Sequence, residues 1–243
     1  MEKVLIYGVN PVIEALKAGA AVRVFVSAKR EEMSQILSLA GERGVPVERV
    51  NPSFFETFPK GHQSVAAKVR EKSISSIGEM LDAAARLGEQ PLLIALDGVE
   101  DPRNLGAIMR SALALGAHGI IIGKHRQSGL TPEVFKASAG AAWSLPAARE
   151  ANIKYALDQL KERGLVIAGT SAGAGVAPWV ADLRVPLVLV LGSEGAGLRR
   201  VVSGRCDYLM SIPVRGVGSL NVSVSAGIFL SEILRQRSSK EKQ

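Results

Sequence analysis

The stretch LVLVLGSEGAGL at residues 187–198 decides the fold, because five consecutive apolar residues run directly into a loop that contains three glycines. Such a continuous apolar run is typical of a strand covered on both faces, as in a parallel sheet. The small residues that follow leave backbone N–H groups accessible, and open parallel sheets bind ligands at these carboxyl ends of strands. The stretch therefore predicts a parallel α/β domain with a binding site at residues 192–198.

Similar apolar runs recur along the second part of the chain. They predict strands at residues 92–96, 119–122, 165–168 and 209–214, in addition to the run at 187–191. Helical patterns lie between and after them, at residues 105–115, 132–143, 153–163 and 220–237. Strands that alternate with helices in this way predict a doubly wound parallel sheet, which we assign to residues 91–243.

The first part of the chain predicts a smaller α/β domain with a mixed sheet, over residues 1–70. A helix starts at Asn10-Pro11, and another spans residues 31–43 and ends at Gly44. Strands are expected at residues 22–27, 45–50 and 64–69. The cluster Phe54, Phe55 and Phe58 reads as core packing. Residues 71–90 form a linker that contains a short helix at 77–86.

Composition excludes several classes of site and of protein. The chain of 243 residues has no apolar run long enough to span a bilayer, and its single cysteine, Cys206, rules out an internal disulfide. One thiol fits a reducing, cytoplasmic environment, and Cys206 is expected to be a half-buried packing residue. His62, His118 and His125 lack metal-ligand spacing, so we expect surface or loop histidines and no metal.

The net charge of +7 permits a polyanionic partner, and its distribution adds detail. Residues 90–243 hold 18 Lys and Arg against 12 Asp and Glu, whereas residues 1–89 are nearly balanced at 12 against 11. Four arginines flank the glycine loop and the stretch that follows it, at positions 199, 200, 205 and 215. They form either a solvated rim or a phosphate-binding rim. Aromatic residues make up only 5%, so ring stacking is not expected to be the main device for binding single strands.

Three short motifs follow the predicted strands in order. The first places Arg110 six residues after Asn104, the second is the glycine loop with Glu194, and the third is SLNVS at residues 219–223. Together they resemble the motifs of the SpoU (TrmH-like) RNA ribose methyltransferases of the SPOUT superfamily. Residues 7–16 and the pair His62-Gln63 resemble the L30e-like substrate-binding domain of that family. The branch they resemble most is the RlmB-type 23S rRNA guanosine 2′-O-methyltransferases.

The resemblance implies a trefoil knot in the C-terminal domain, which the pattern of strands alone argues against. It also implies a homodimer and S-adenosylmethionine as methyl donor, without a metal. The residues that it implies, together with Thr170 at a strand end, form three sets. The catalytic set is Asn104, Arg110, Glu194, Ser219 and Asn221; the cofactor set is Thr170, Gly192, Ile212 and Leu220; the RNA-binding set is Asn10, His62, Gln63, Arg199, Arg200 and Arg215.

Within the catalytic set, Glu194 and Arg110 are expected to have different roles. Glu194 is expected to order the loops of the site together with Asn104. Arg110 has a guanidinium that stays protonated up to a pH above about 12, so it suits a phosphate clamp or an oxyanion stabiliser better than a general base. The identity of the base is left open, and an RNA phosphate is one candidate.

Other functions remain open at this point. The same reaction on tRNA, or on another rRNA nucleotide as an antibiotic-resistance trait, uses the same motifs. A non-catalytic RNA-binding or ribosome-assembly factor uses the same scaffold, although the complete motifs argue against it. A nicotinamide-dependent oxidoreductase fits the sheet, but the chain lacks the glycine fingerprint and the acidic ribose-binding residue of that class.

Overall fold

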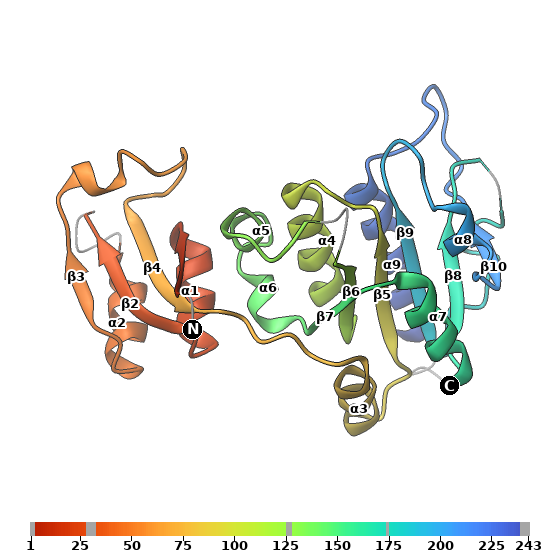
Figure 1. Ribbon diagram of the computed structural model, residues 1–243, viewed down its shortest axis with the longest axis horizontal. Coiled ribbons are helices and arrows are strands. Elements are labelled where there is room, and N and C mark those ends of the chain that lie inside the picture. The colour runs from red at the N-terminus through yellow and green to blue at the C-terminus, as the bar shows by residue number, and fades with distance from the viewer. Residues whose placement is uncertain (1–2, 28–32, 125–127, 174, 239–243) are drawn as a thin grey trace.

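Two separate β-sheets organise the chain, one on either side of the segment that joins them (Figure 1). The computed structural model describes residues 3–27, 33–124, 128–173 and 175–238. His125 and most of the C-terminal tail lie outside the described residues. The first sheet belongs to the N-terminal domain and the second to the larger domain, so the predicted mixed α/β architecture is confirmed.

The N-terminal sheet has four strands and is mixed. In spatial order they are β1 (Lys3–Tyr7), β4 (Val65–Arg70), β2 (Ala21–Val26) and β3 (Val47–Arg49). Only β2 and β3 are parallel, and β4 runs antiparallel to both of its neighbours. The helices α1 (Val9–Lys17) and α2 (Ser34–Glu42) pack on one face, and the 3₁₀ helix η2 (Pro52–Phe55) follows β3.

The second sheet has six strands, and every neighbouring pair is parallel. Their spatial order is β10 (Tyr208–Met210), β8 (Val166–Thr170), β9 (Leu187–Gly192), β5 (Leu92–Asp97), β6 (Gly119–Gly123) and β7 (Ala147–Glu150). Both central strands, β9 and β5, are buried along their whole length. Their continuous apolar sequence therefore reflects cover on both faces, as predicted.

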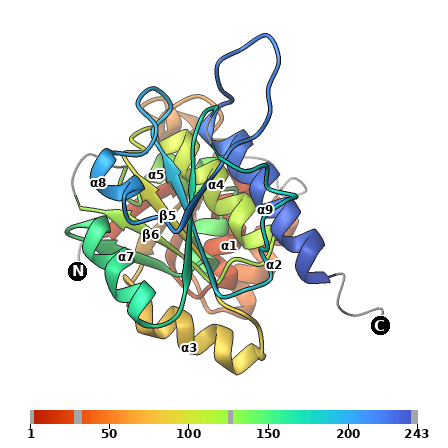
Figure 2. The same cartoon turned by 90° about the vertical axis from the view of Figure 1, so that its right-hand side faces the viewer.

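Helices form a layer on each face of this sheet (Figure 2). One layer consists of α4 (Pro102–Ala114), α5 (Pro132–Ala137), α6 (Ala141–Ser144) and α9 (Val222–Ser238). The other consists of α3 (Ile77–Leu87), α7 (Ile153–Glu162) and the short α8 (Arg200–Ser203). The segment between β10 and α9 projects beyond the end of the sheet (Figure 2).

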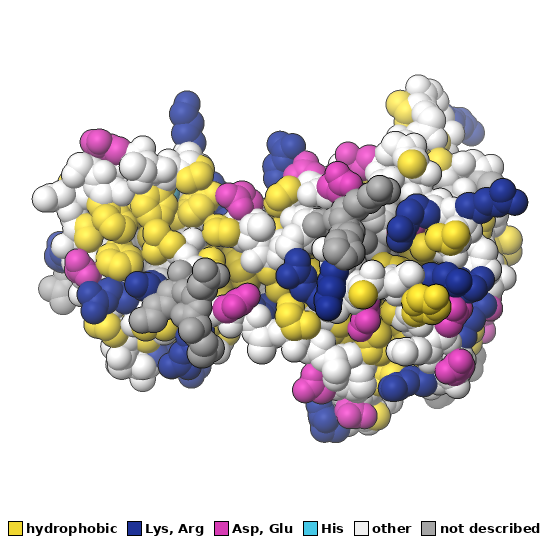
Figure 3. All heavy atoms as spheres, in the orientation of Figure 1, with side chains coloured by type: hydrophobic (Ala, Val, Ile, Leu, Met, Phe, Trp, Pro, Cys, Tyr) yellow, Lys and Arg dark blue, Asp and Glu magenta, His cyan; other side chains and the backbone are white. Residues whose placement is uncertain are grey.

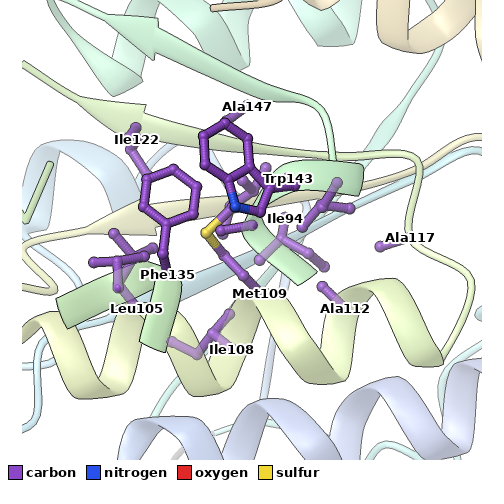
Figure 4. Close-up of a cluster of buried hydrophobic side chains, with 14 of the residues drawn as sticks. Ile94, Leu105, Ile108, Met109, Ala112, Ala117, Ile122, Phe135, Trp143 and Ala147 are labelled. Carbon is purple, nitrogen blue, oxygen red and sulfur yellow. The ribbon is translucent and has the colours of Figure 1, made fainter. Parts of the chain in front are cut away.

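The core beneath α4 is densely packed (Figure 4). Met109 points from α4 toward the rings of Phe135 and Trp143, which stack with centroids 4.3 Å apart. Gly106 lets α5 approach α4, because a Cβ there would lie 2.5 Å from the Cβ of Ala137. This packing fixes the helix that carries the first motif.

Several predicted elements need correction. The predicted strand at 209–214 is only β10, and the helix expected at 132–143 is two helices. The break lies at Ala139 and Gly140, whose φ angles of 50° and 89° are left-handed and cannot continue a helix. The strands β1 and β7 were not predicted. Both are edge strands of four or five residues, which give a weak periodic signal.

Side-chain contacts join the N-terminal domain to the larger one. Lys136 on α5 donates from Nζ to the carbonyl oxygen of Lys60 at 2.8 Å and lies 4.9 Å from the centre of the Tyr7 ring. Gly140 faces the side chain of Glu14 so closely that no Cβ would fit. One continuous set of buried apolar residues runs through both domains. The two sheets are therefore linked by direct packing as well as by the chain.

The linker is itself held against the larger domain. Lys72 donates from Nζ to the carbonyl oxygens of Trp143 and Leu145, at 2.8 and 2.9 Å, at the end of α6. Burial lowers the pKa of this ammonium group to about 8. The backbone N–H of Ser75 donates to the carbonyl of Ala147 on β7. The short helix predicted at residues 77–86 of the linker is present as α3.

The described residues contain no helix that is both long and apolar enough to cross a membrane. The trefoil knot that the resemblance implies stays a prediction, as do the domain boundaries at residues 70 and 91.

Candidate active site

A cavity of about 530 Å³ lies at the carboxyl ends of β8, β9 and β10. Thr170 and Gly192 are the last residues of β8 and β9, and both line it. Ile212 and Leu220, from the segment between β10 and α9, line it as well. The structure thus brings together all four residues predicted to bind the cofactor, at the strand ends where parallel sheets bind ligands.

The chemistry of the cavity wall restricts its ligand. Among the described residues that line it, Glu194 is the only one with an ionisable side chain, and none is Lys or Arg. The other lining groups are apolar side chains, hydroxyl groups and backbone. Such a wall suits a neutral nucleoside with an attached cation, whereas Lys or Arg side chains, the usual partners of a polyphosphate, are missing from its described residues. S-Adenosylmethionine, which carries adenosine and a sulfonium, fits this donor set.

Gly192 lets the glycine loop fold back against the end of β9. A Cβ at this position would collide with the backbone of Gly197 and Leu198, which folds back against the end of β9. Ser193 and Gly197 exchange backbone hydrogen bonds of 3.1 and 3.0 Å that close this turn. The glycine therefore allows the loop to approach itself, and the loop shapes one wall of the cavity.

Three motif residues meet at Glu194, which lines the cavity. Asn104 donates from Nδ2 to Oε1 of Glu194 at 3.0 Å, and Asn221 donates from its own Nδ2 to Oδ1 of Asn104 at 3.0 Å. Asn221 also donates to Oε1 of Glu194. Each of the three motifs contributes one member to this cluster, and Ser219 lies in the cavity wall nearby along the chain. A carboxylate that accepts from two amides fixes the orientation of both side chains.

Helix starts place the two asparagines. Asp101 caps α4 by accepting from the N–H of Arg103 at 2.8 Å, and Pro102 occupies the first turn, so Asn104 is held near the helix start. Asn221 accepts through Oδ1 from the N–H of Ser223 at 2.9 Å, directly before α9. Asn221 thus caps α9, and the same side chain is part of the cluster.

Arg110 lies apart from this cluster. It is exposed on α4 and does not line the cavity, and it makes no hydrogen bond or ion pair with the part of the chain that the structure describes. Six residues along a helix correspond to about 9 Å of rise and about 240° of rotation, so Arg110 and Asn104 point in different directions. Within one chain, the structure therefore leaves Arg110 outside the site.

Asp97 is a site-forming residue that the sequence reasoning missed. It ends β5, is 1% exposed, and accepts from both the backbone and the side chain of Arg199, at 2.8 Å from N and 2.6 Å from Nε. This pair ties the end of the glycine loop to the central strand. An aspartate at the end of a strand in a parallel sheet was the available signal. The Arg199 side chain stays 54% exposed, and Arg200 and Arg215 are exposed.

The three predicted RNA-binding residues of the N-terminal domain cluster around one turn. Gln63 accepts through Oε1 from the N–H of Val9 at 3.0 Å, which satisfies the start of α1, where Asn10 is exposed. His62 accepts through Nδ1 from the N–H of Ser64 at 2.9 Å, and its ring stacks on Phe55 with centroids 5.0 Å apart. His62 and Gln63 thus have structural partners, and Asn10 is open to solvent.

Two predictions about single residues have definite outcomes. His118 was expected on the surface or in a loop: it lies in the loop between α4 and β6 but is only 7% exposed, accepts from the N–H of Leu92 through Nδ1, and places Nε2 3.2 Å from Glu89. Burial lowers the pKa of its imidazole. Cys206 is half-buried as expected, and burial raises the pKa of its thiol to about 11, which leaves it unreactive near neutral pH.

With this geometry established, comparison with known proteins identifies the family. Residues 91–231 match the sequence model of the SpoU rRNA methylase family, and residues 5–75 match that of the RNA 2′-O ribose methyltransferase substrate-binding domain. The chain belongs to the SpoU methylase family. Its two matched segments correspond to the two sheets, and the SpoU motifs supply the three members of the cluster.

The similarity to known proteins extends over nearly the whole chain. The Bacillus subtilis protein YacO, named as a TrmH family tRNA/rRNA methyltransferase, is 40% identical over 96% of this chain and 95% of its own. The crystal structure of the SpoU methyltransferase AviRb from Streptomyces viridochromogenes, in complex with AdoMet, superimposes with a TM-score of 0.82 at 29% identity, covering 98% and 91% of the two chains. The A. aeolicus TrmH/SpoU tRNA modifying enzyme aligns over 67% of this chain and 86% of its own, with a TM-score of 0.56 and 27% identity.

These matches make the SpoU protein described here an RNA methyltransferase with S-adenosylmethionine as its methyl donor. The donor supplies the reactive methyl group, so the protein chiefly binds, orients and desolvates the reactants. Thr170, Gly192, Ile212 and Leu220, predicted to bind the cofactor, all line the cavity.

Proposed function

We propose that this SpoU protein transfers the methyl group of S-adenosylmethionine to the ribose 2′-hydroxyl of a guanosine in 23S rRNA. The observation that carries the proposal is the cluster of Asn104, Glu194 and Asn221, in which Glu194 also lines the cavity. Amide groups whose orientation is fixed can position a neutral hydroxyl next to a bound methyl donor. Positioning of this kind can contribute about 7–11 kcal/mol to lowering a barrier.

In this proposal each part of the site has a distinct task. The cavity residues hold the cofactor, and Glu194 keeps both amides in place while its charge complements the sulfonium. Asn104, Ser219 and Asn221 hold the ribose. Arg110, exposed on α4, clamps an RNA phosphate near the reacting nucleotide. The group that accepts the hydroxyl proton stays unassigned, and the same RNA phosphate is a candidate.

The N-terminal domain supports rRNA as the substrate class. Its sequence matches a substrate-binding domain, and a tRNA modifying enzyme of the family aligns over only 67% of the chain. In the proposal the larger substrate is held by the additional domain, through Asn10, His62 and Gln63, and by Arg199, Arg200 and Arg215 around the cavity. The enzyme then acts in the cytoplasm, on 23S rRNA or an assembling large subunit.

An apolar surface on α4 and α9 supports a homodimer. Leu113 on α4 is 39% exposed, and Val224 and Ile228, one turn apart on α9, are 51% and 37% exposed. Large apolar groups that share one surface of a water-facing helix pair are typical of an interface. A second copy seated there would lie beside Arg110, which occupies the same face of α4 as Leu113, three residues on. We expect a dimer by light scattering, and a monomer for Val224→Glu with Ile228→Glu.

Methyl transfer from radiolabelled S-adenosylmethionine tests the reaction and its substrate together. Purified protein is incubated with unmethylated 23S rRNA or with total tRNA, and an Arg110→Ala variant is the matched control. We expect label as 2′-O-methylguanosine in 23S rRNA and its loss in the variant. Label in tRNA would overturn the substrate class and keep the reaction. Absence of label together with absence of cofactor binding by calorimetry would favour a non-catalytic RNA-binding factor.

A further inference from the structure

Among the described residues, α1 and α2 cover one face of the N-terminal sheet, and the short 3₁₀ helix η2 packs on part of the other. Val24 and Val26 of β2 and Val65, Ala67 and Val69 of β4 point into the core that α1 and α2 cover. The alternate residues face the other side, which α5 meets only at its β1 edge, through the contact of Lys136 with Tyr7. Figure 3 shows hydrophobic side chains gathered over β2, β4 and the segment between β3 and β4. We call this the open face of the sheet.

Aromatic rings concentrate on the open face. Four of the six phenylalanines of the chain lie between residues 25 and 58. Phe25 on β2 stacks on Phe54 with centroids 5.2 Å apart, and Phe54 lies 5.5 Å from Phe58. Phe55 is 2% exposed and forms the base of the cluster, whereas Phe25, Phe54 and Phe58 remain partly exposed. Packing in the core accounts for the buried ring of Phe55. It does not account for the exposed parts of the rings of Phe25, Phe54 and Phe58.

The same face carries uncompensated positive charge. Lys68 and Arg70 alternate with the core residues of β4 and so lie on the open face, beside Arg23 of β2. Arg23 forms an ion pair of 2.9 Å with Glu48, in which both side chains are about half exposed. For Lys68 and Arg70 the structure gives no ion pair with any of the described residues. The rings are therefore bordered by more cations than carboxylates.

We propose that the open face binds unpaired nucleotides of the RNA substrate, with bases stacked on Phe25, Phe54 and Phe58 and phosphates held by Lys68 and Arg70. The inference rests on the proposed function, since it takes the substrate to be RNA. Every base has a face that stacks on an aromatic ring, and phosphates pair with Lys and Arg. The charge favours RNA over an apolar protein partner, which would leave Lys68 and Arg70 unpaired on binding.

Fluorescence anisotropy with a short, labelled single-stranded RNA of mixed sequence tests the stacking part on the full chain. We expect Phe25→Leu together with Phe54→Leu to weaken binding by about 5- to 100-fold, because leucine keeps the apolar contact and loses the stacking face. Phe55→Leu is the matched control, since it alters a buried ring of the same cluster and is expected to bind within about twofold of the unchanged protein. Equal weakening by both would overturn the proposal, because it would indicate a packing effect.

Charge reversal provides a second measurement that does not depend on the rings. Lys68→Glu with Arg70→Glu is expected to weaken RNA binding and to reduce the salt dependence of log K by about 1 to 2. Arg86→Glu with Arg163→Glu changes the net charge equally on the exposed surface of α3 and α7, and should leave binding within a few-fold. Equal effects of the two pairs would overturn the proposal.

Measurements of cofactor binding and methyl transfer distinguish a failure of the open-face proposal from a failure of the proposed reaction. All of these variants should bind S-adenosylmethionine with unchanged affinity, because the open face is remote in sequence and sheet from the cavity. RNA binding that depends on the rings, without any methyl transfer, would support the open face and contradict the proposed reaction. Methyl transfer that is unaffected by the ring and charge variants at limiting RNA would contradict the open face alone.

Discussion

Asn104 and Asn221 show how much of the site can be predicted from single residues of the sequence. Asn221 caps α9, a position that asparagine favours, whereas Asn104 lies in the first turn of α4, which Asp101 caps. Their contacts join residues that are 90 and 117 positions apart, so no local pattern contains them. Only the resemblance to a family placed Asn104, Glu194 and Asn221 in one site. The buried Asp97, whose partner Arg199 is 102 positions away, was missed for the same reason.

The cluster predicts coupled effects of substitution. Asn104→Ala and Glu194→Gln should each lower kcat for methyl transfer by about 10²-fold, since each releases an oriented amide. The double variant should be little worse than the slower single one, because residues that act as a unit are not additive. Single-turnover kinetics with saturating cofactor measures this, and additive losses would contradict the coupling.

Asn152→Ala is the matched control for these variants. Asn152 caps α7 by accepting from the N–H of Lys154 at 3.1 Å and has no part in the cluster. Its loss should cost about 1 kcal/mol of stability and leave kcat unchanged. A kcat that fell with Asn152→Ala would indicate that the assay reports stability.

At the scale of helices and strands, the long buried elements were predictable and the short ones were not. The continuous apolar sequences of β5 and β9 are stable only where other elements bury both faces of the strand. The division between α5 and α6 depends on a left-handed pair of residues, of which Ala139 carries no sequence signal for such a conformation. Beyond β10 the chain leaves the sheet after Met210, because it lines the cavity instead of pairing.

The contact between α4 and α5 predicts a large effect of one methyl group. Gly106→Ala should lower the free energy of unfolding by about 1–3 kcal/mol, because the new Cβ would meet Ala137, Ser138 N and Val134 O within 2.9 Å. Gly41→Ala is the control: it lies in α2 with nothing within 4 Å, and it should stabilise by about 0.5–1 kcal/mol. Urea denaturation compares the two, and a neutral Gly106→Ala would show that α5 can move away.

At the scale of the whole molecule, the link between the domains has a predicted pH dependence. Below pH 8, Lys72 is charged in the folded and the unfolded chain, and the cost of its burial is fully present. Between pH 8 and about 10.4, the usual value for lysine, the folded protein holds fewer protons at this site than the unfolded chain. Stability contributed by Lys72 therefore rises with pH over that window.

Comparison with Lys72→Met isolates this contribution, since other groups titrate equally in both proteins. The free energy of unfolding of the unchanged protein, minus that of the variant, should increase by about 3 kcal/mol from pH 7.5 to 10.5. Urea denaturation across that range measures it. A difference that stays constant or falls with pH would show that the ammonium group is not desolvated by the contacts with Trp143 and Leu145.

The contact of Lys136 with Lys60 and Tyr7 has a consequence for modular exchange within the family. A chimaera that carries the N-terminal domain of a relative would receive one half of this junction without the other. A side chain at the position of Gly61 would meet Lys136 Nζ, which lies 2.8 Å from where its Cβ would stand. Recombination between relatives at the linker should therefore succeed only where α5 and the loop at residues 60–63 have been inherited together.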